Sequence, residues 1–187
     1  HMDHIGKIPK LVREGFKGKI ISTVETKELA LPMLEDALRV MKSRHPEKTL
    51  YEKEDIQKAL SLWESLPYSK ELELNKDIKI DMQNAGHVLG SAIINVDLIP
   101  LAPFILKGEP NKQTRVSFTG DLGNSPSPLL PDTEIPQNSD YIVMESVYGD
   151  RNHEDKKERR ENLKNAIKKG IERGGNIIIP AFSIERT

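Results

Sequence analysis

The spacing of the apolar residues changes near Glu71, and this change constrains the fold more than any other feature of the chain. Before it, residues 29–41 and 56–63 place apolar side chains at helical spacing, which predicts two amphipathic helices. After it, residues 78–82 alternate apolar and charged side chains, which is typical of a strand with one buried face. A chain with both periods must pack helices against a sheet.

The first long helix is expected from about Thr26, with Ser22 and Glu25 spaced as a capping box. Pro32 should kink this helix or mark a restart. A second helix is expected at residues 52–66, with Trp63 on its apolar face. The apolar stripe of the first helix is expected to comprise Leu29, Met33, Ala37, Val40 and Met41.

The remaining segments continue the mixture of helices and strands. Strands separated by helices, some of them fully apolar, predict an α/β fold built as a layered sandwich. A loop with Pro and Gly at residues 100–113 is expected between two of the strands. The other expected elements are a helix at residues 10–15, strands at 18–23, 93–99, 114–119, 141–144 and 176–180, and a helix at 154–173 buried through Leu163, Ala166, Ile167 and Ile171.

The composition narrows the classes of protein. The 187 residues contain no cysteine, which excludes disulfides and thiolate metal sites and suits a reducing cytoplasm. No apolar run is long enough to cross a bilayer, and no signal-peptide pattern is present, so a membrane partner is not expected. The formal net charge of -1 gives no basic footprint, so a nucleic-acid partner must be argued from the site.

Five residues form the candidate metal site. They occupy glycine-punctuated turns beside apolar runs, where side chains from several strand ends can converge. Imidazole nitrogens and carboxylate oxygens without thiolates are the ligands of a hydrolytic zinc centre that keeps a position open for water. The candidates are His1, Asp3, His4, His87 and Asp121.

Each candidate has an ordinary alternative when it is taken alone. Asp3 and His4 could be solvated groups near a terminus, and a lone histidine such as His87 is more often a core or surface group. Asp121 stands in a turn where aspartate is common for local backbone reasons. His1 and the following methionine can also derive from a cloning vector.

The order of four local sequences resembles the metallo-β-lactamase superfamily. The segments are Asp-His-Ile-Gly at residues 3–6, Ala-Gly-His-Val-Leu-Gly-Ser-Ala at 85–92, Phe-Thr-Gly-Asp-Leu-Gly at 118–123 and Met-Glu-Ser-Val-Tyr-Gly-Asp-Arg at 144–151. The last segment is similar to the β-CASP branch, which contains RNA-processing nucleases. The Pro-Ala-Phe-Ser sequence at residues 180–183 extends the resemblance.

This resemblance implies a partial αββα sandwich and a two-zinc ribonuclease. His1 and His87 would bind the first zinc, Asp3 and His4 the second, and Asp121 both. A hydroxide between the metals would attack the phosphodiester of single-stranded RNA. Glu145 matches an acidic residue that orients a histidine acting as general acid; its alternative role is to cap the following helix.

The resemblance also has departures. The family motif begins with a histidine that would precede His1, and a further zinc ligand and the acid histidine would lie beyond Thr187. Val147 stands where many relatives have threonine. Residues 1–175 are therefore expected to be a partial metallo-β-lactamase-like domain, and residues 176–187 the start of a segment leading into a β-CASP domain absent from this chain. Alone, the chain is expected to be inactive.

Two other functions stay open at this point. A hydrolase of the same superfamily could act on a small ester or thioester, and an inactive paralogue could serve as a binding subunit. A homodimer is also compatible with the sequence. Residues His45 and His153 match no ligand motif and are interpreted as surface groups, and the basic run at 156–160 alternates with acids, as a solvated helix face does.

Overall fold

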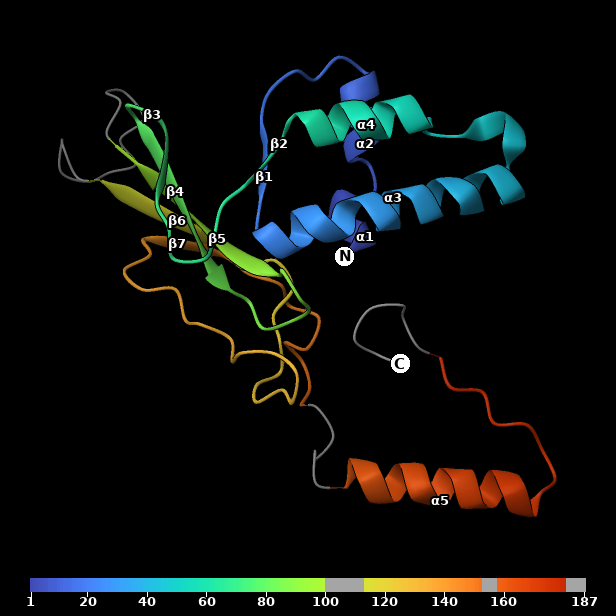
Figure 1. Cartoon of the computed structure of the whole chain (residues 1–187). Coiled ribbons are helices and arrows are strands. Elements are labelled where there is room, and N and C mark those ends of the chain that lie inside the picture. The colour runs from blue at the N-terminus through green and yellow to red at the C-terminus, as the bar shows by residue number, and fades with distance from the viewer. Residues whose placement is uncertain (100–112, 153–157, 181–187) are drawn as a thin grey trace. The chain divides into compact units, whose positions relative to one another are not determined.

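A computed structural model describes residues 1–99, 113–152 and 158–180. The chain divides into two compact units, His1–Met144 and Glu145–Thr187, and each is described by itself. The first contains a group of helices and a five-stranded sheet, and the second contains one helix (Figure 1). The mixed α/β content agrees with the sequence prediction, while the four-layered sandwich remains a prediction.

The helices of the first unit are arranged around α3 (Val24–Arg44). Its N-cap is Thr23, whose side chain accepts a hydrogen bond from the backbone N–H of Thr26 at 3.3 Å. The expected capping box is therefore wrong, because the Ser22 hydroxyl donates to the Thr23 carbonyl oxygen instead. The other helices of this unit are α1 (Met2–Ile5), α2 (Ile8–Arg13), the 3-10 helix η1 (Pro46–Lys48) and α4 (Lys53–Ser61).

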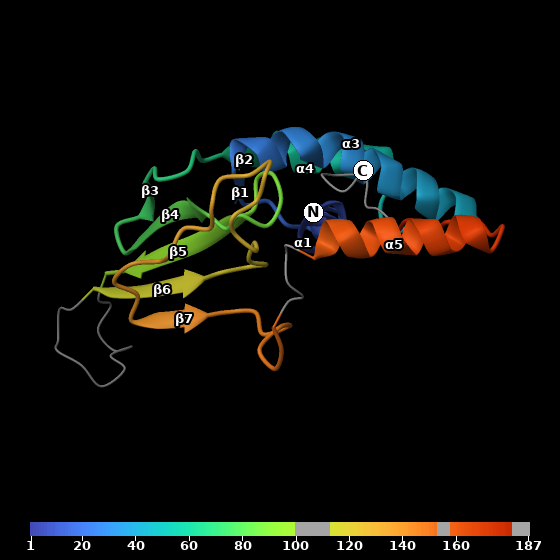
Figure 2. The same ribbon diagram turned by 90° about the horizontal axis from the view of Figure 1, so that it is seen from below.

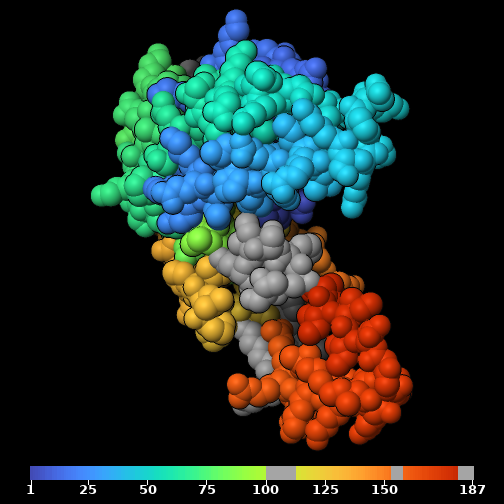
Figure 3. Space-filling view, turned by 45° about the vertical axis from the view of Figure 1, so that its right-hand side comes forward, coloured from blue at the N-terminus to red at the C-terminus, as the bar shows by residue number. Residues whose placement is uncertain are grey.

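Pro32 neither ends nor restarts α3, which runs through it as one helix. The buried stripe of α3 is Ala30, Leu34 and Leu38, one position away from the predicted stripe. Val40, which was expected in the core, is 42% exposed. Helices α3 and α4 lie side by side and present one continuous surface (Figure 3).

Strand β2 (Trp63–Ser65) was missed in the sequence, which predicted a helix through this segment. Helix α4 ends at Ser61, and β2 then pairs in parallel with β1 (Ile20–Ser22). The Trp63 indole N–H donates to the Ser22 hydroxyl at 2.8 Å. Pairing with a distant strand thus overrides the helical spacing that Trp63 shares with the preceding turns.

The five-stranded sheet has the order β3-β4-β5-β6-β7 (Figure 2). The pairs β3–β4, β4–β5 and β5–β6 are antiparallel, and the pair β6–β7 is parallel. Because β4 and β6 both run antiparallel to β5, their carboxyl ends lie at the same end of the sheet. The bounds are β3 (Leu72–Asn75), β4 (Ile78–Asn84), β5 (Ala92–Leu98), β6 (Thr114–Phe118) and β7 (Tyr141–Val143).

The two faces of this sheet differ in chemistry. Ile80 and Met82 join a core cluster with Leu66 on one face. The other face carries a polar network in which the Arg115 guanidinium forms an ion pair with Asp97 at 2.7 Å. The same guanidinium pairs with Asp81; Asn95 donates to Asp81 and Gln83, and the Ser117 hydroxyl donates to Asn95.

The second unit contains α5 (Arg159–Glu172), and no residue of this helix is buried. The expected buried face is therefore wrong, since Leu163 is 54% and Ile171 68% exposed. The expected strand at residues 176–180 is also wrong: these residues pair with no strand in the described structure. Without a neighbouring strand, their apolar side chains have no sheet to join, and Ile178 is 88% exposed.

Some expectations lie outside the described residues. These are most of the loop at 100–113, His153, the beginning of the basic run and residues 181–187. Within the described part of the chain, no helix is both long and apolar enough to cross a membrane.

Candidate metal centre

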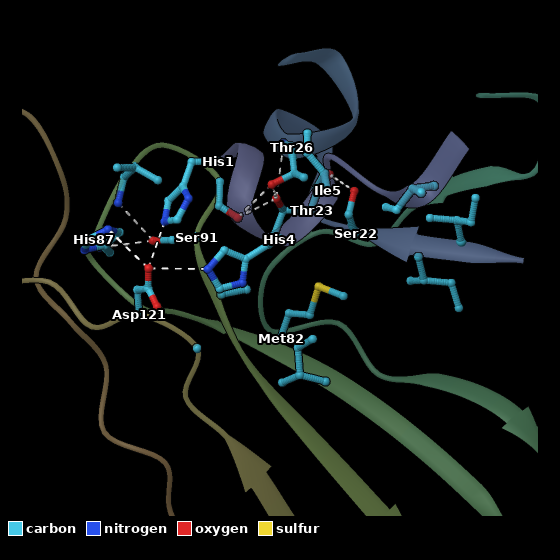
Figure 4. A pocket seen from close by; sticks show the side chains of 18 of the residues that line it. His1, His4, Ile5, Ser22, Thr23, Thr26, Met82, His87, Ser91 and Asp121 are labelled. Atoms are coloured by element: carbon cyan, nitrogen blue, oxygen red, sulfur yellow. Dashed lines mark hydrogen bonds and ion pairs between the residues drawn. The ribbon is translucent and has the colours of Figure 1, made fainter. Parts of the chain in front are cut away.

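Two histidine side chains from distant parts of the chain meet at one carboxylate oxygen of Asp121 (Figure 4). The Nε2 atom of His1 lies 2.8 Å from Oδ2 of Asp121, and Nε2 of His87 lies 3.7 Å from the same oxygen. One potential ligand atom from each residue lies within 4.8 Å of those of the other two. The cluster is half-buried, so its polar atoms are ordered by the fold and still reachable from solvent.

His4 extends the cluster, and Asp3 lies at its rim. Nε2 of His4 is 3.3 Å from Oδ2 of Asp121, and its ring meets the His1 ring edge-on with centroids 4.6 Å apart. The Asp3 side chain is 89% exposed, and its carboxylate is 3.6 Å from Nδ1 of His1. The structure therefore brings four of the five candidate ligands together, and their binding of a metal remains a prediction.

Helix α1 places the two N-terminal histidines. His1 is the N-cap of α1, and the backbone N–H of His4 donates to the His1 carbonyl oxygen at 3.1 Å. Residues three positions apart on a helix lie on one side of it, so both rings reach Asp121. Asp3 lies between them in sequence, and its exposed carboxylate lies beside Nδ1 of His1 instead of reaching Asp121.

The loop after β4 presents His87, and Ser91 holds this loop in shape. The Ser91 hydroxyl oxygen accepts hydrogen bonds from the backbone N–H groups of His87 at 3.0 Å and Val88 at 3.2 Å. The Tyr68 hydroxyl donates to the Ser91 carbonyl oxygen at 3.0 Å. Burial, assisted by the negative charge of Glu25, raises the pKa of Tyr68 to about 12, so this donor keeps its proton at neutral pH.

Strand β6 delivers Asp121 three residues after its last residue. The backbone N–H of Thr119 donates to the Val143 carbonyl oxygen at 3.0 Å, which extends the tie between β6 and β7. Ser117, which is fully buried in β6, contacts the Ser139 hydroxyl at 2.6 Å. Both bonds tie the end of β6 to the β7 segment and therefore help to fix the direction in which the Asp121 turn leaves the sheet.

A cavity of about 230 Å³ adjoins the cluster. Its polar wall includes His1, His4, His87 and Asp121, and its apolar wall includes Ile5, Trp63 and Met82. Thr23 and Thr26 also line it, but their hydroxyls donate to the Gly90 carbonyl oxygen at 2.8 and 3.0 Å. The ionisable side chains that line the cavity are therefore the four residues of the cluster.

Comparison with known proteins identifies relatives of this chain. No protein-family model matches the chain. Over its whole length, the chain is 34% identical to "Ribonuclease TTHA0252" of Thermus thermophilus and 30% identical to "RNase aCSPSF2" of Saccharolobus solfataricus. It is 29% identical to "Cleavage and polyadenylation specificity factor subunit 3" of Dictyostelium discoideum. These homologues are RNA nucleases of the β-CASP branch of the metallo-β-lactamase superfamily, so the predicted resemblance to that branch is confirmed. It spans 39%, 35% and 22% of the lengths of these three relatives.

The donors of the cluster fit a zinc-type ion. Three imidazoles and one shared carboxylate are the borderline ligands that zinc accepts, and the sequence offers no thiolate. The carboxylate has a second oxygen, so it can serve two ions. The half-buried position beside a cavity leaves room for a substrate group next to such ions.

Glu145 begins the second unit of the chain and is half-buried. The N-cap of α5 is Glu158, so the interpretation of Glu145 as a cap of the following helix is wrong. Its catalytic role remains a prediction. His45, the C-cap of α3, is exposed and lies apart from the metal-site residues, as expected for a surface group.

Two residues that shape the ligand loops were not singled out in the sequence. Ser91 carried a weak signal, because it follows His87 by four residues inside a glycine-bounded loop. Thr133 carried none, since its hydroxyl bonds to a carbonyl oxygen 48 residues away in sequence. Contacts of this length have no periodicity that a sequence pattern can reveal.

Proposed function

We propose that this chain carries the metal-binding part of a zinc-dependent ribonuclease that hydrolyses phosphodiester bonds in RNA. The observation that carries the proposal is the convergence of three histidine rings on Oδ2 of Asp121. The names of the relatives, which include two ribonucleases and a cleavage factor, favour RNA over a small ester as the substrate.

His1 and His87 would hold the first zinc, and His4 with Asp3 the second. Asp121 would contribute to both sites. Zinc ions bound there supply activation of water at neutral pH and neutralisation of phosphate charge. The work of the protein is to hold the imidazoles in position, through α1 for His1 and His4 and through the loop fixed by Ser91 for His87.

Asp3 must turn toward its neighbours for this assignment. Its side chain is exposed and its carboxylate lies 3.6 Å from Nδ1 of His1. A carboxylate at this position can also accept a hydrogen bond from Nδ1 and so orient the His1 ring. Carboxylates are common outer partners of histidines that bind metals. Glu145 is proposed to position a proton-donating histidine from outside residues 1–187, which would protonate the leaving oxygen of the cut RNA.

The proposed substrate is single-stranded RNA. The proposed location is the cytoplasm, because a chain without cysteine has no disulfide that a reducing compartment could break. A homodimer is a further part of the proposal. Light scattering of the complete protein measures the assembly state independently of activity.

Metal content tests the proposal directly. The complete protein, purified without chelator, should contain about two zinc ions per chain by elemental analysis, the number implied by the paired ligand sets. It should cleave labelled single-stranded RNA, and EDTA should abolish the cleavage. A metal-free protein that takes up no zinc on titration would rule out the metallohydrolase.

A further inference from the structure

Residues 122–133, which follow Asp121, lead back to the backbones of both loops that carry the candidate ligands. The residue that contacts both loops is Thr133, which is half-buried. The Thr133 hydroxyl donates to the Ala85 carbonyl oxygen at 3.1 Å and lies 3.4 Å from the Gly123 carbonyl oxygen. Ala85 is two residues before His87, and Gly123 is two residues after Asp121. One hydroxyl therefore spans the backbones of the two ligand loops.

The three backbones meet too closely for side chains. Gly86 has a φ of +65°, and a Cβ atom there would lie 2.5 Å from Oγ1 of Thr133 and 2.9 Å from its backbone nitrogen. A Cβ atom on Gly123 would overlap the Gly86 carbonyl group. Interiors packed this tightly transmit a small displacement of one segment to the next.

Further hydrogen bonds fix the same junction. The Gly123 N–H donates to the Ala85 carbonyl oxygen at 2.8 Å, so this oxygen accepts two bonds. The backbone N–H of Thr133 donates to the Ser125 hydroxyl oxygen at 2.7 Å, and the Ser125 hydroxyl lies 3.1 Å from Oγ1 of Thr133. The Thr133 hydroxyl is thus oriented by Ser125 toward the two carbonyl groups.

We propose that Thr133 is a positioning residue that fixes the spacing between His87 and Asp121 and thereby sets the metal affinity of the site they share. This inference rests on the proposed function, because it assigns a role only if these two residues bind a metal. Thr133 touches no ligand side chain in the described structure; it acts through the backbones of Ala85 and Gly123. Outer partners that orient metal ligands are typically worth 10- to 100-fold in metal affinity.

The test compares Thr133→Val with Thr133→Ser in the complete protein. Valine keeps the shape and removes the hydroxyl, whereas serine keeps the hydroxyl and removes one methyl group. Metal-free protein is titrated with Zn²⁺ and, separately, with Co²⁺. The visible absorption of bound Co²⁺ reports the geometry of its ligands. Thr133→Val should weaken zinc binding by about tenfold and alter the cobalt spectrum, and Thr133→Ser should restore both. The half-buried Thr114 of β6 provides the matched control as Thr114→Val, which should bind zinc as the wild type does.

The outcomes separate the inference from the proposed function. Wild-type protein that binds neither ion contradicts the proposed function, and the inference falls with it. Wild-type protein that binds both ions, together with Thr133→Val of equal affinity and unchanged cobalt spectrum, overturns the inference alone. If Thr133→Ser binds as weakly as Thr133→Val, the hydroxyl is not responsible.

A second variant covers the case in which Thr133→Val does not fold. Ser125→Ala removes the group that orients the Thr133 hydroxyl and leaves the hydroxyl in place. This exposed position should tolerate the change, and zinc binding should weaken by about threefold, less than for direct removal of an outer partner. Wild-type zinc affinity in Ser125→Ala would then contradict the inference.

Discussion

Asp121 offers one oxygen to three imidazole rings, and this makes its charge the most consequential at the site. Asp121→Asn keeps the shape but replaces the anionic oxygen with a neutral amide oxygen. We expect zinc binding to weaken by more than about tenfold, since even outer partners of metal ligands have effects of this size. Zinc stoichiometry and affinity measure the change, with the exposed Asp132→Asn as control. Full zinc content in Asp121→Asn would contradict the assignment.

Glu145 is proposed to act on proton transfer and not on metal binding. Glu145→Gln should therefore leave the zinc content unchanged and slow RNA cleavage by about 10²-fold, the low end of what acid–base assistance contributes. Zinc analysis and single-turnover cleavage are measured on the same preparation, with Glu172→Gln at the exposed end of α5 as control. Cleavage at the wild-type rate would show that the family role does not apply to Glu145.

At the scale of elements, Thr23 links the start of α3 to the loop that follows His87. It accepts from the Thr26 N–H and donates to the Gly90 carbonyl oxygen, and it is buried. Thr23→Ala removes both contacts, and loss of an N-cap costs about 1 kcal/mol. Amide hydrogen exchange in the first turn of α3 should accelerate about fivefold, as this energy implies. Ser43→Ala, an exposed position on the same helix, is the control; unchanged exchange in Thr23→Ala would show that the cap is dispensable.

Four of the five strands of the large sheet could be predicted from the sequence, whereas β3 and parts of the helical group could not. In β4, the alternation of apolar and polar residues directly reflects one buried face, so its position was predicted correctly. Trp63 has the spacing of a helical residue but pairs with Ile20, a partner 43 positions away. The stripe of α3 was misplaced by one residue because Met33 and Leu34 are both apolar, and only the packing of α3 against the neighbouring elements selects between them.

The site was predictable to a similar degree. The resemblance named His1, His4, His87 and Asp121, and the strand directions explain why two of them meet: β4 and β6 end at one edge of the sheet. The exposed position of Asp3 did not follow from its motif, because adjacent residues on a helix point in different directions. The junction at Thr133 depends on backbone contacts that no local pattern encodes.

At the scale of the whole molecule, the chain is expected to need the rest of its protein for activity. The described residues bring together one cluster of candidate ligands, and the chain spans only 39% of the Thermus thermophilus ribonuclease. Residues 1–187 alone should therefore leave labelled single-stranded RNA intact, while the complete protein cleaves it. The two forms are compared at equal zinc and RNA concentrations. Efficient, EDTA-sensitive cleavage by residues 1–187 would show that the essential residues all lie within them.

His1 and Asp121 are 120 positions apart in sequence, yet their side chains lie within hydrogen-bonding distance. An ion bound by both side chains would act as a reversible cross-link. It would close a loop that contains most of the first unit. The entropy of such a long loop in the unfolded chain is large, and each doubling of length adds only slowly to it. Zinc supply would then influence how much of the protein is folded, and metal starvation would expose the chain to proteolysis as well as remove the proposed catalytic ions.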